Sequence, residues 1–335
     1  MLLRCSEHLP GTGGRLAEAA AEEVLIKKPA DTGEHLWVKV QKDSGLGTNQ
    51  VRQALARSVA VSPDLVSDAG NRDRNAQFIQ WFSLPLEPID HPGPIRRAGA
   101  HNKMRVLEVT HSHKPFTAAN VDRVRWKVRI AGGNLDGGYL KGRAILDHLR
   151  VHGVPNYVPL ARLGPDGQWA KWGKLILRGE RLPTAVTRSG EVTPGSCLKA
   201  VQDWLFNRWV TARMSDGLLG RTVEGDRIRN RQGVEELVID PTHADKRVEA
   251  WEAAVLGPLF GAGMGQVTGE AAAREAAILA EAELGSTAKL QGDRRALRFQ
   301  PQKSLLDLDG KDLVLSCELP VDASVHGLVD EIIKG

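Results

Sequence analysis

One carboxylate in the chain is flanked by an arginine on each side. Within residues 70–77, Asp73 stands between Arg72 and Arg74. Two nearby guanidinium groups favour the ionised form of a carboxyl group. An ionised carboxylate in a polar segment can act as a nucleophile toward an electrophilic sugar carbon. The alternative is a loop aspartate that bridges its neighbours, and the residues alone leave both interpretations open.

A second pattern combines cations with strict alternation between residues 121 and 130. A period of two predicts a half-buried strand with one apolar face and one cationic face. Cations on such a face repeat about every 6.6–6.8 Å, close to the step of an extended nucleic-acid backbone. The alternative is an edge strand that charge protects from aggregation. The apolar set is Val124, Trp126, Val128 and Ile130, and the cationic set is Arg123, Arg125, Lys127 and Arg129.

Several elements must position these residues. Residues 36–42 and 77–84 have the β-branched and aromatic content of strands. Residues 50–59 predict a helix that Thr48 or Asn49 caps. The Ala/Glu-rich residues 16–24 favour a helix, and the Pro/Gly-rich residues 88–100 favour a loop. The remaining predicted elements are helices at 140–152, 197–214, 269–284 and 328–333 and a strand at 313–319.

Length and composition limit the class of protein. The 335 residues are enough for about two domains, and residues 153–159, rich in Pro and Gly, are the best candidate for a boundary. Hydrophobic residues make up 41% of the chain and charged residues 26%, as in ordinary globular proteins. No apolar run approaches the ~20 residues that span a bilayer. We therefore expect a cytoplasmic protein without a membrane partner.

Charge is unevenly distributed along the chain. The net charge is only +4, but residues 93–153 carry a local charge of +8 and residues 224–285 one of −6. The first region is a plausible surface for a polyanion, and the second a solvated acidic part. The three scattered cysteines disfavour a disulfide framework. His111 and His113 lack companion ligands at metal-binding spacing, so we expect a surface loop there and no metal site.

The Asp73 segment resembles the signature of the TruD family of tRNA pseudouridine synthases, Gly-x-Lys-Asp-Arg/Lys-His-Ala-x-Thr-x-Gln-Trp. Residues 153–157 are similar to the family's second signature, and further matches at 205–207, 257–261 and 294–296 follow in family order. The resemblance therefore covers nearly the whole chain. The residues that match the first signature are Gly70, Asp73, Arg74, Ala76, Gln80 and Trp81.

The resemblance implies a function. The family isomerises uridine-13 in the D-arm of tRNA to pseudouridine with an aspartate nucleophile, which falls on Asp73, and with neither a metal nor an organic cofactor. The aromatic residue that stacks on the target base falls on Trp126. The remaining candidates for contact with RNA are Arg72, Arg74, Asn75, Gln80, Asn156, Tyr157, Arg162, Arg123, Arg125, Lys127 and Arg129.

This chain departs from the family pattern at several positions. Arg72 replaces the family's lysine, Asn75 its histidine and Phe78 its threonine. Residues 123–124 replace a Gly-Asn pair, which removes an amide that would contact the base. The family's N-terminal lysine has no clear counterpart, and Arg15 is the nearest candidate. These departures concern the substrate more than the chemistry, because the aspartate is retained.

The resemblance also implies an architecture. We expect an α+β, V-shaped monomer whose catalytic domain, residues 1–153 and 293–335, contains a mixed, largely antiparallel sheet. An inserted α/β domain would span residues 154–292. The cationic strand would then line a groove that receives tRNA. The alternative function is a catalytically weak RNA-binding or RNA-folding protein on the same scaffold.

Overall fold

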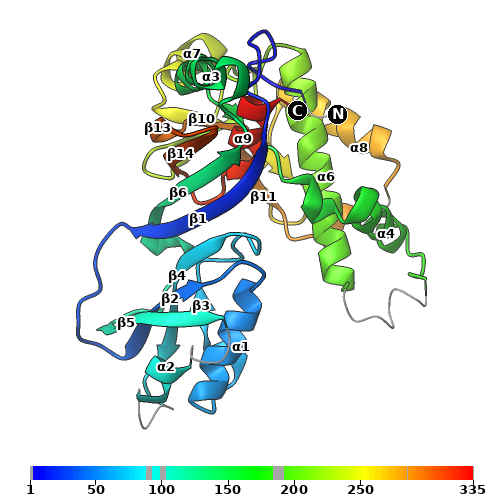
Figure 1. The fold of residues 1–335 in the computed structure, drawn as a ribbon. Coiled ribbons are helices and arrows are strands. Elements are labelled where there is room, and N and C mark those ends of the chain that lie inside the picture. The colour runs from blue at the N-terminus through cyan, green and yellow to red at the C-terminus, as the bar shows by residue number, and fades with distance from the viewer. Residues whose placement is uncertain (1–2, 88–92, 99–102, 184–191, 285, 335) are drawn as a thin grey trace. The chain divides into compact units, whose positions relative to one another are not determined.

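The computed structural model describes residues 3–87, 93–98, 103–183, 192–284 and 286–334 (Figure 1). The chain forms two compact units. The eight-stranded unit comprises Gly11–Ala144, Pro301–Ala323 and Ile333–Gly335, and the four-stranded unit comprises Met1–Pro10, Ile145–Gln300 and Ser324–Ile332. The predicted division into a catalytic and an inserted domain concerns function and stays a prediction.

The sheet of the eight-stranded unit is mixed and largely antiparallel, as predicted. Its order is β13-β14-β6-β1-β4-β2-β5, and β3 pairs with β4. Only β1 and β4 run parallel among the pairs of this sheet in the described residues. The strands are β1 (Arg15–Leu25), β2 (His35–Lys42), β3 (Ser67–Asp68), β4 (Gln77–Pro85), β5 (Met104–Ser112), β6 (Val121–Ala131), β13 (Gln302–Asp309) and β14 (Asp312–Leu319).

The predicted helix at residues 16–24 is wrong, because this segment is the strand β1. The strand pairs with β6 along most of its length and with β4 on its other side, and Figure 1 shows β1 and β6 as long neighbouring arrows. Helix propensities differ by less than about 1 kcal/mol per residue, so pairing on both sides overrides them. His111 lies in β5 rather than in a loop.

The strand β6 confirms the alternating pattern. Val124, Trp126, Val128 and Ile130 are buried, whereas the four cations are exposed or intermediate. The strand lies between β1 and β14 inside the sheet. The alternative of a charge-protected edge strand is therefore wrong, and the cations need another explanation.

Helix α1 (Thr48–Ser58) covers one face of the sheet near β2 and β4. Its residues Val51 and Leu55 pack in one core with Val38 and Phe82. Gly47, rather than Thr48 or Asn49, is the N-cap, so Thr48 belongs to the first turn. The predicted loop at 88–100 contains the short helix α2 (Gly93–Arg97), and residues 88–92, 99 and 100 lie outside the described residues.

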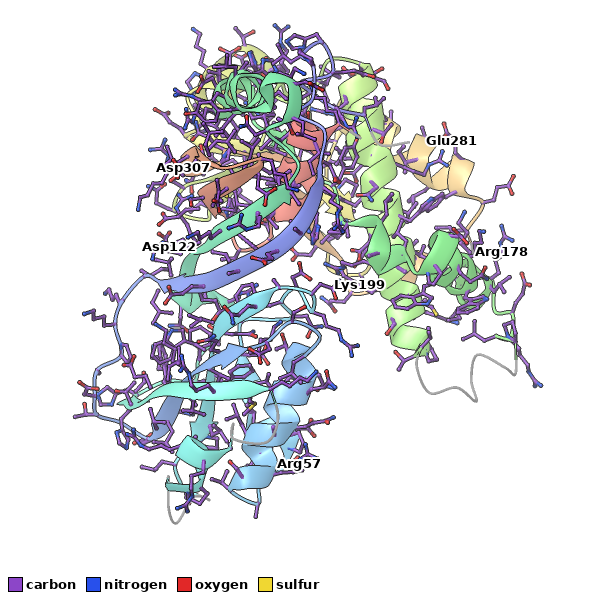
Figure 2. All side chains as sticks on the ribbon, viewed as in Figure 1. Arg57, Asp122, Arg178, Lys199, Glu281 and Asp307 are labelled. Atoms are coloured by element: carbon purple, nitrogen blue, oxygen red, sulfur yellow. The ribbon has the colours of Figure 1, made fainter. Side chains whose placement is uncertain are left out.

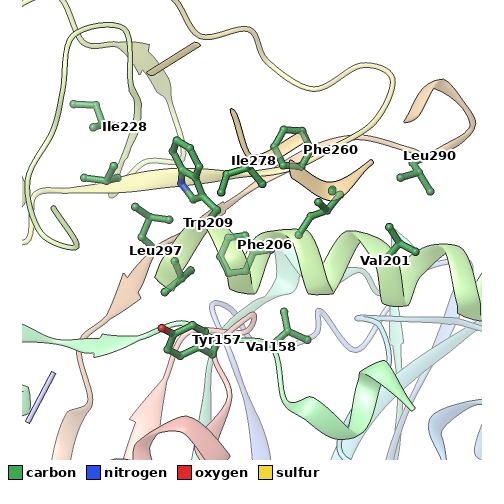
Figure 3. Close-up of a cluster of buried hydrophobic side chains, with 14 of the residues drawn as sticks. Tyr157, Val158, Val201, Phe206, Trp209, Ile228, Phe260, Ile278, Leu290 and Leu297 are labelled. Atoms are coloured by element: carbon green, nitrogen blue, oxygen red, sulfur yellow. The ribbon is translucent and has the colours of Figure 1, made fainter. Parts of the chain in front are cut away.

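The four-stranded unit is built on the long helix α6 (Pro194–Ser215). Phe206 and Trp209 of α6 lie in a buried cluster with Val158 and Leu297 (Figure 3). The predicted helices are confirmed here with small changes at their ends. The other elements are α4 (Gln168–Leu177), α7 (Pro241–Glu249), α8 (Gly269–Ala282), α9 (Val325–Ile333), β7 (Val154–Pro155), β8 (Arg227–Asn230), β9 (Glu235–Leu237), β10 (Ala253–Leu259), β11 (Asp293–Ala296) and β12 (Arg298–Phe299).

Helix α3 (Gly138–His152) connects the two units. The chain then forms β7, which pairs with β12 from the C-terminal part of the sequence. In the same way, β14 from the C-terminal part of the sequence pairs with β6 in the eight-stranded sheet. Within the described ranges, no helix is long and apolar enough to cross a membrane.

Candidate active site

The loop that carries Asp73 connects β3 to β4, and its backbone is held along four successive carbonyl groups. The Nζ atom of Lys42 donates to the carbonyl oxygens of Asp73 (2.7 Å) and Ala76 (2.9 Å). The backbone N–H of Gly45 donates to the carbonyl of residue 74 (2.8 Å), and the Ser44 hydroxyl donates to that of Asn75 (2.8 Å). The last residue of β2 and the segment that follows it therefore fix the loop.

The side chain of Asp73 is half-buried, and it is oriented within its own loop. Its Oδ1 atom accepts a hydrogen bond from the backbone N–H of Asn75 at 2.9 Å. Arg74 is exposed, and its Nε atom donates to the carbonyl of Gly45 at 2.7 Å. Asn75 is also exposed. Arg74 and Asn75 are thus accessible to a large substrate.

Arg72 has an internal partner instead. Its Nε atom lies 2.8 Å from Oε1 of Glu23, and its side chain is only 7% exposed. Its backbone N–H donates to the Thr48 hydroxyl at 3.0 Å. The structure therefore places Arg72 beneath the loop as a support for Asp73, and its contact with RNA stays a prediction.

Glu23 and Gln80 complete this support. Glu23 is 2% exposed, and its second oxygen accepts from the backbone N–H of Trp81 at 2.8 Å. Burial raises the pKa of Glu23, and the charge of Arg72 opposes that rise. Gln80 is buried, accepts from Thr48 (3.2 Å) and donates to the carbonyl of Gly70 (3.0 Å). Gln80 thus belongs to the loop's internal hydrogen bonds.

The side chains below the loop share one face of the sheet. Trp126 lies opposite Ala21 on β1, Ala21 lies opposite Phe78 on β4, and Phe78 lies opposite Lys42 on β2. Residues directly opposite one another in neighbouring strands project to the same side. Trp126 is 6% exposed and packs edge-on against Phe78 at 5.7 Å between ring centroids. Its Nε1 atom is buried without a hydrogen-bond partner among the described residues.

The four cations of β6 lie on the opposite face, and acidic residues from several strands neutralise most of them. Lys127 is exposed, and within the described residues it has no ion-pair partner. The local charge of +8 therefore overstates the cationic character of this surface. The ion pairs are Arg123–Asp122 (3.8 Å), Arg125–Glu318 (3.2 Å), Arg125–Glu22 (3.9 Å), Arg129–Asp309 (2.6 Å), Arg129–Asp312 (3.2 Å) and Arg129–Glu18 (3.7 Å).

This difference between Lys127 and Arg125 predicts two unequal effects on RNA binding. Lys127→Ala should lower the slope of log affinity against log salt by about one if the lysine meets a phosphate. Arg125→Ala should lower it by less, because its charge is already offset by Glu318 and Glu22. Filter binding of tRNA across a range of salt concentrations measures both slopes. An unchanged slope for Lys127→Ala would mean that this face does not contact RNA.

Asn156 and Tyr157 lie inside the four-stranded unit. Asn156 is fully buried, donates to the carbonyl of Ala296 at 3.0 Å and accepts from Arg295 at 2.8 Å. Tyr157 is 7% exposed, its hydroxyl lies 3.1 Å from that of Thr211, and burial raises its pKa. Both residues support the fold of this unit, and direct contact of either with RNA stays a prediction.

Lys42 and Glu23 are residues of the site that the sequence motifs do not mark. Lys42 is 1% exposed, and burial lowers its pKa to about 8, against the opposing effect of Asp73. A signal for Lys42 was present, because it shares the parity of Leu36 and Val40 on β2 and so falls on the buried face. Glu23 has no such signal, because its Ala/Glu-rich segment favours a helix locally. No three His, Cys, Asp or Glu residues in the described ranges are placed to hold a metal ion.

The buried amine predicts a pH-dependent stability. Lys42→Met should lower the free energy of unfolding by about 1–3 kcal/mol, because two loop carbonyls lose their donor. The folded pKa of about 8 lies below the ordinary 10.5, so the unfolded state binds more protons between these values. The stability of the parent should therefore rise with pH across this window, by at most about 1.4 kcal/mol per pH unit.

Urea unfolding at pH values below and above 8 measures this difference. The parent should gain stability relative to Lys42→Met as the pH rises. Lys39→Met is the matched control, because Lys39 lies on the other face of β2 and pairs with Glu22 at 2.8 Å near the surface. If the parent and Lys42→Met show parallel pH dependence, the Lys42 amine is not held in the state that the structure shows.

Comparisons with known proteins identify the family of this chain. The family model described as tRNA pseudouridine synthase D (TruD) matches residues 4–188 and 197–321. The tRNA pseudouridine synthase D of Anaeromyxobacter dehalogenans (strain 2CP-1) is 32% identical, covering 98% of this chain and 94% of the relative. That of a Thermus thermophilus strain is 29% identical, covering 98% of this chain and 91% of the relative.

A solved structure extends the likeness to the fold. The crystal structure of a putative tRNA pseudouridine synthase D (TruD) from Methanosarcina mazei superposes with a TM-score of 0.64 at 18% identity. It covers 98% of this chain, and this chain covers 95% of it. The family match, the relatives and the ordered signatures span both units of the structure. The chain belongs to the tRNA pseudouridine synthase D family.

Proposed function

We propose that this enzyme converts uridine-13 in the D-arm of tRNA to pseudouridine, with Asp73 as the nucleophile. Family membership supports pseudouridine formation in tRNA. The observation that carries the assignment of Asp73 is the loop itself, whose four carbonyls at residues 73–76 are all held. A fixed backbone presents one carboxylate, between an exposed Arg74 and a buried Arg72, without rearrangement. Such preorganisation is what nucleophilic catalysis requires.

The reaction is an isomerisation, so no atom is gained or lost overall. A carboxylate oxygen of Asp73 bonds to the ribose carbon as the bond from that carbon to N1 of uracil breaks. The uracil leaves with the electron pair, turns, and bonds to the same carbon through C5, which releases the carboxylate. The proton on C5 is then lost, and N1 takes up a proton. Arg74 lies next to the nucleophile and is exposed, so it can neutralise a phosphate of the approaching RNA.

Trp126 is the proposed stacking partner of the target base, and its mutation gives a direct test. Stacking of a base on an aromatic side chain contributes roughly 1–3 kcal/mol, so Trp126→Ala should lower turnover by about tenfold or more. Trp126→Phe, which keeps an aromatic ring, should retain most of the activity. Because Trp126 is buried against Phe78, thermal unfolding must be measured alongside. Full activity of the folded Trp126→Ala variant would make Trp126 a core residue only.

Mapping of pseudouridine in bulk tRNA, before and after treatment with the protein, tests the proposed function. A new pseudouridine at position 13 and at no other position is the expected result. Conversion at another position would correct the target but retain the chemistry. Tight tRNA binding without any conversion would favour the alternative of an RNA-binding or RNA-folding protein. The proposed functional division, a catalytic domain of residues 1–153 and 293–335 with an insertion of 154–292, rests on the same assignment.

A further inference from the structure

In the four-stranded unit, Arg162 and Lys199 both lie near one buried carboxylate, that of Asp203. These residues are far in sequence from the Asp73 loop. Asp203 lies on α6 and is 2% exposed. An Nη2 atom of Arg162 lies 2.9 Å from its Oδ2, and the Nζ atom of Lys199 lies 3.6 Å from its Oδ1. Lys199 precedes Asp203 by one helical turn, and Figure 2 labels it on α6. The carboxylate thus holds two cationic heads near each other.

A third cation, Arg295 of β11, adds to the same charge. Its guanidinium donates to the buried Asn156 at 2.8 Å and lies over the ring of Phe206 at 5.3 Å. The pKa of Lys199 is lowered first by burial and then by the positive charges of Arg162 and Arg295, against the attraction of Asp203. Phe206 follows Asp203 by about one helical turn on α6, so Arg295 lies against the same part of that helix. Among the described residues, Arg162 and Lys199 share the single carboxylate of Asp203, so this grouping carries one more positive charge than negative charge.

The cluster is held by buried polar groups. Lys199 donates to Oε1 of Gln202 at 2.7 Å, and Gln202 is fixed by its donation to the carbonyls of Phe260 and Gln291 at 3.0 and 2.9 Å. The side chains of Arg162 and Lys199 are nevertheless 48% and 46% exposed. The cationic heads are accordingly positioned before a ligand arrives, and they are accessible to one.

Other buried ion pairs of the same unit are balanced. Arg213 pairs with Asp226 at 2.9 Å, and Arg294 with Glu275 at 2.7 Å, one cation to one carboxylate. These pairs are closed within the unit, with every partner nearly buried. The cluster around Asp203 differs from them because its positive charge exceeds its negative charge and reaches the surface. An anion would relieve the repulsion that the three cations exert on one another.

We propose that Arg162, Lys199 and Arg295 bind a backbone phosphate of the RNA substrate. The inference rests on the proposed function, since a tRNA supplies the phosphate. Guanidinium groups bind phosphate with two parallel hydrogen bonds, and an ammonium adds a compact charge. The occupant is an RNA phosphate rather than a small free anion, because the cluster is half-exposed instead of enclosed. Asn156 then acts as a positioning residue, holding Arg295 from inside the unit.

The test compares two double variants with equal change in net charge. Arg162→Gln with Lys199→Gln should weaken tRNA binding by about tenfold at low salt and lower the salt slope by about one, as one phosphate contact is lost. The control is Lys171→Gln with Arg181→Gln, two exposed cations of the same unit, which should change neither quantity appreciably. Thermal unfolding verifies that each variant is folded. A third variant, Arg162→Lys with Lys199→Arg, keeps both charges and should restore most of the affinity.

Each outcome decides the proposal. Unchanged affinity and slope in the Gln double variant would overturn it, as would an equal loss in the control. Inorganic phosphate, compared with chloride at equal ionic strength, should displace tRNA from the parent only weakly. If phosphate instead binds the parent in a manner that the Gln variant abolishes while tRNA binding is unaffected, the site takes a free anion and the RNA proposal is wrong.

The same experiment separates this inference from the proposed function. If the parent binds tRNA through the cluster but forms no pseudouridine, the phosphate site stands and the catalytic assignment is overturned. If the Gln double variant forms pseudouridine with the same KM as the parent, the catalytic assignment stands and the phosphate site is overturned.

Discussion

Asp73→Asn is expected to abolish pseudouridine formation, with a loss of roughly four orders of magnitude or more, while tRNA binding stays equal or tightens. An amide cannot take up the ribose carbon as a carboxylate does. The amide oxygen can still accept the hydrogen bond from Asn75 N–H, and the contact of Lys42 with the loop involves the main chain. The fold of the loop should therefore persist. Loss of one negative charge also favours a polyanion.

Single-turnover conversion and equilibrium binding, measured on the same preparation, separate the two effects. Asp64→Asn is the matched control, because Asp64 is an exposed carboxylate of the same unit outside the loop, and it should behave like the parent in both assays. If Asp73→Asn converts uridine at a rate near the parent's, then Asp73 is a structural residue of the loop and the proposed mechanism does not apply to this chain.

The parts of the fold that the sequence predicted well are those that local pattern determines. The alternation in β6 is visible in the eight consecutive residues 123–130, and burial follows it residue by residue. The predicted strands at β2, β4 and β14 and the long helices α6 and α8 lie where expected. The segment of β1 fails because its Ala and Glu residues favour a helix locally, whereas its partners in β4 and β6 are remote in sequence.

The sequence marks Asp73 as the candidate nucleophile, an assignment that stays a proposal, but it does not reveal the surroundings of that residue. The position of Asp73 follows from its flanking arginines and from the order of the family signatures. The partner of Arg72 could not be found in the same way, because Glu23 lies 49 residues away. The acids that neutralise the β6 cations come from β1, β13 and β14, so a count along the chain cannot see them.

The second family signature shows the same limit. A motif marks Asn156 and Tyr157 as significant, yet it does not distinguish a residue that touches RNA from one that holds the fold. Burial of both side chains favours the second role. The neighbouring Arg162 is an exposed, charged member of the signature. Its pairing with Asp203 depends on the packing of two segments that sequence alone does not bring together.

Removal of Arg72 is expected to cause the largest loss of stability among these changes. Arg72→Met leaves the Glu23 carboxylate buried without its cation, which typically costs about 3–5 kcal/mol. The unfolding free energy in urea should fall by this amount near neutral pH, and activity should fall with it because the Asp73 loop loses its inner anchor. Arg72→Lys restores the family's residue and keeps a charge near Glu23. It should retain more than half of the unfolding free energy that Arg72→Met loses.

The pH dependence identifies the cause of that loss. Burial raises the folded pKa of Glu23 above the ordinary 4.5. In the pH interval between the ordinary pKa and the raised folded pKa, the folded state therefore holds more protons than the unfolded state. Stability is consequently lost as the pH rises through that interval, and without Arg72 the folded pKa rises further. The deficit of Arg72→Met should therefore shrink on acidification, as Glu23 becomes neutral. A deficit that is the same at acid and neutral pH would instead assign it to lost packing of Arg72 against Phe78, whose ring lies 6.0 Å from the guanidinium carbon.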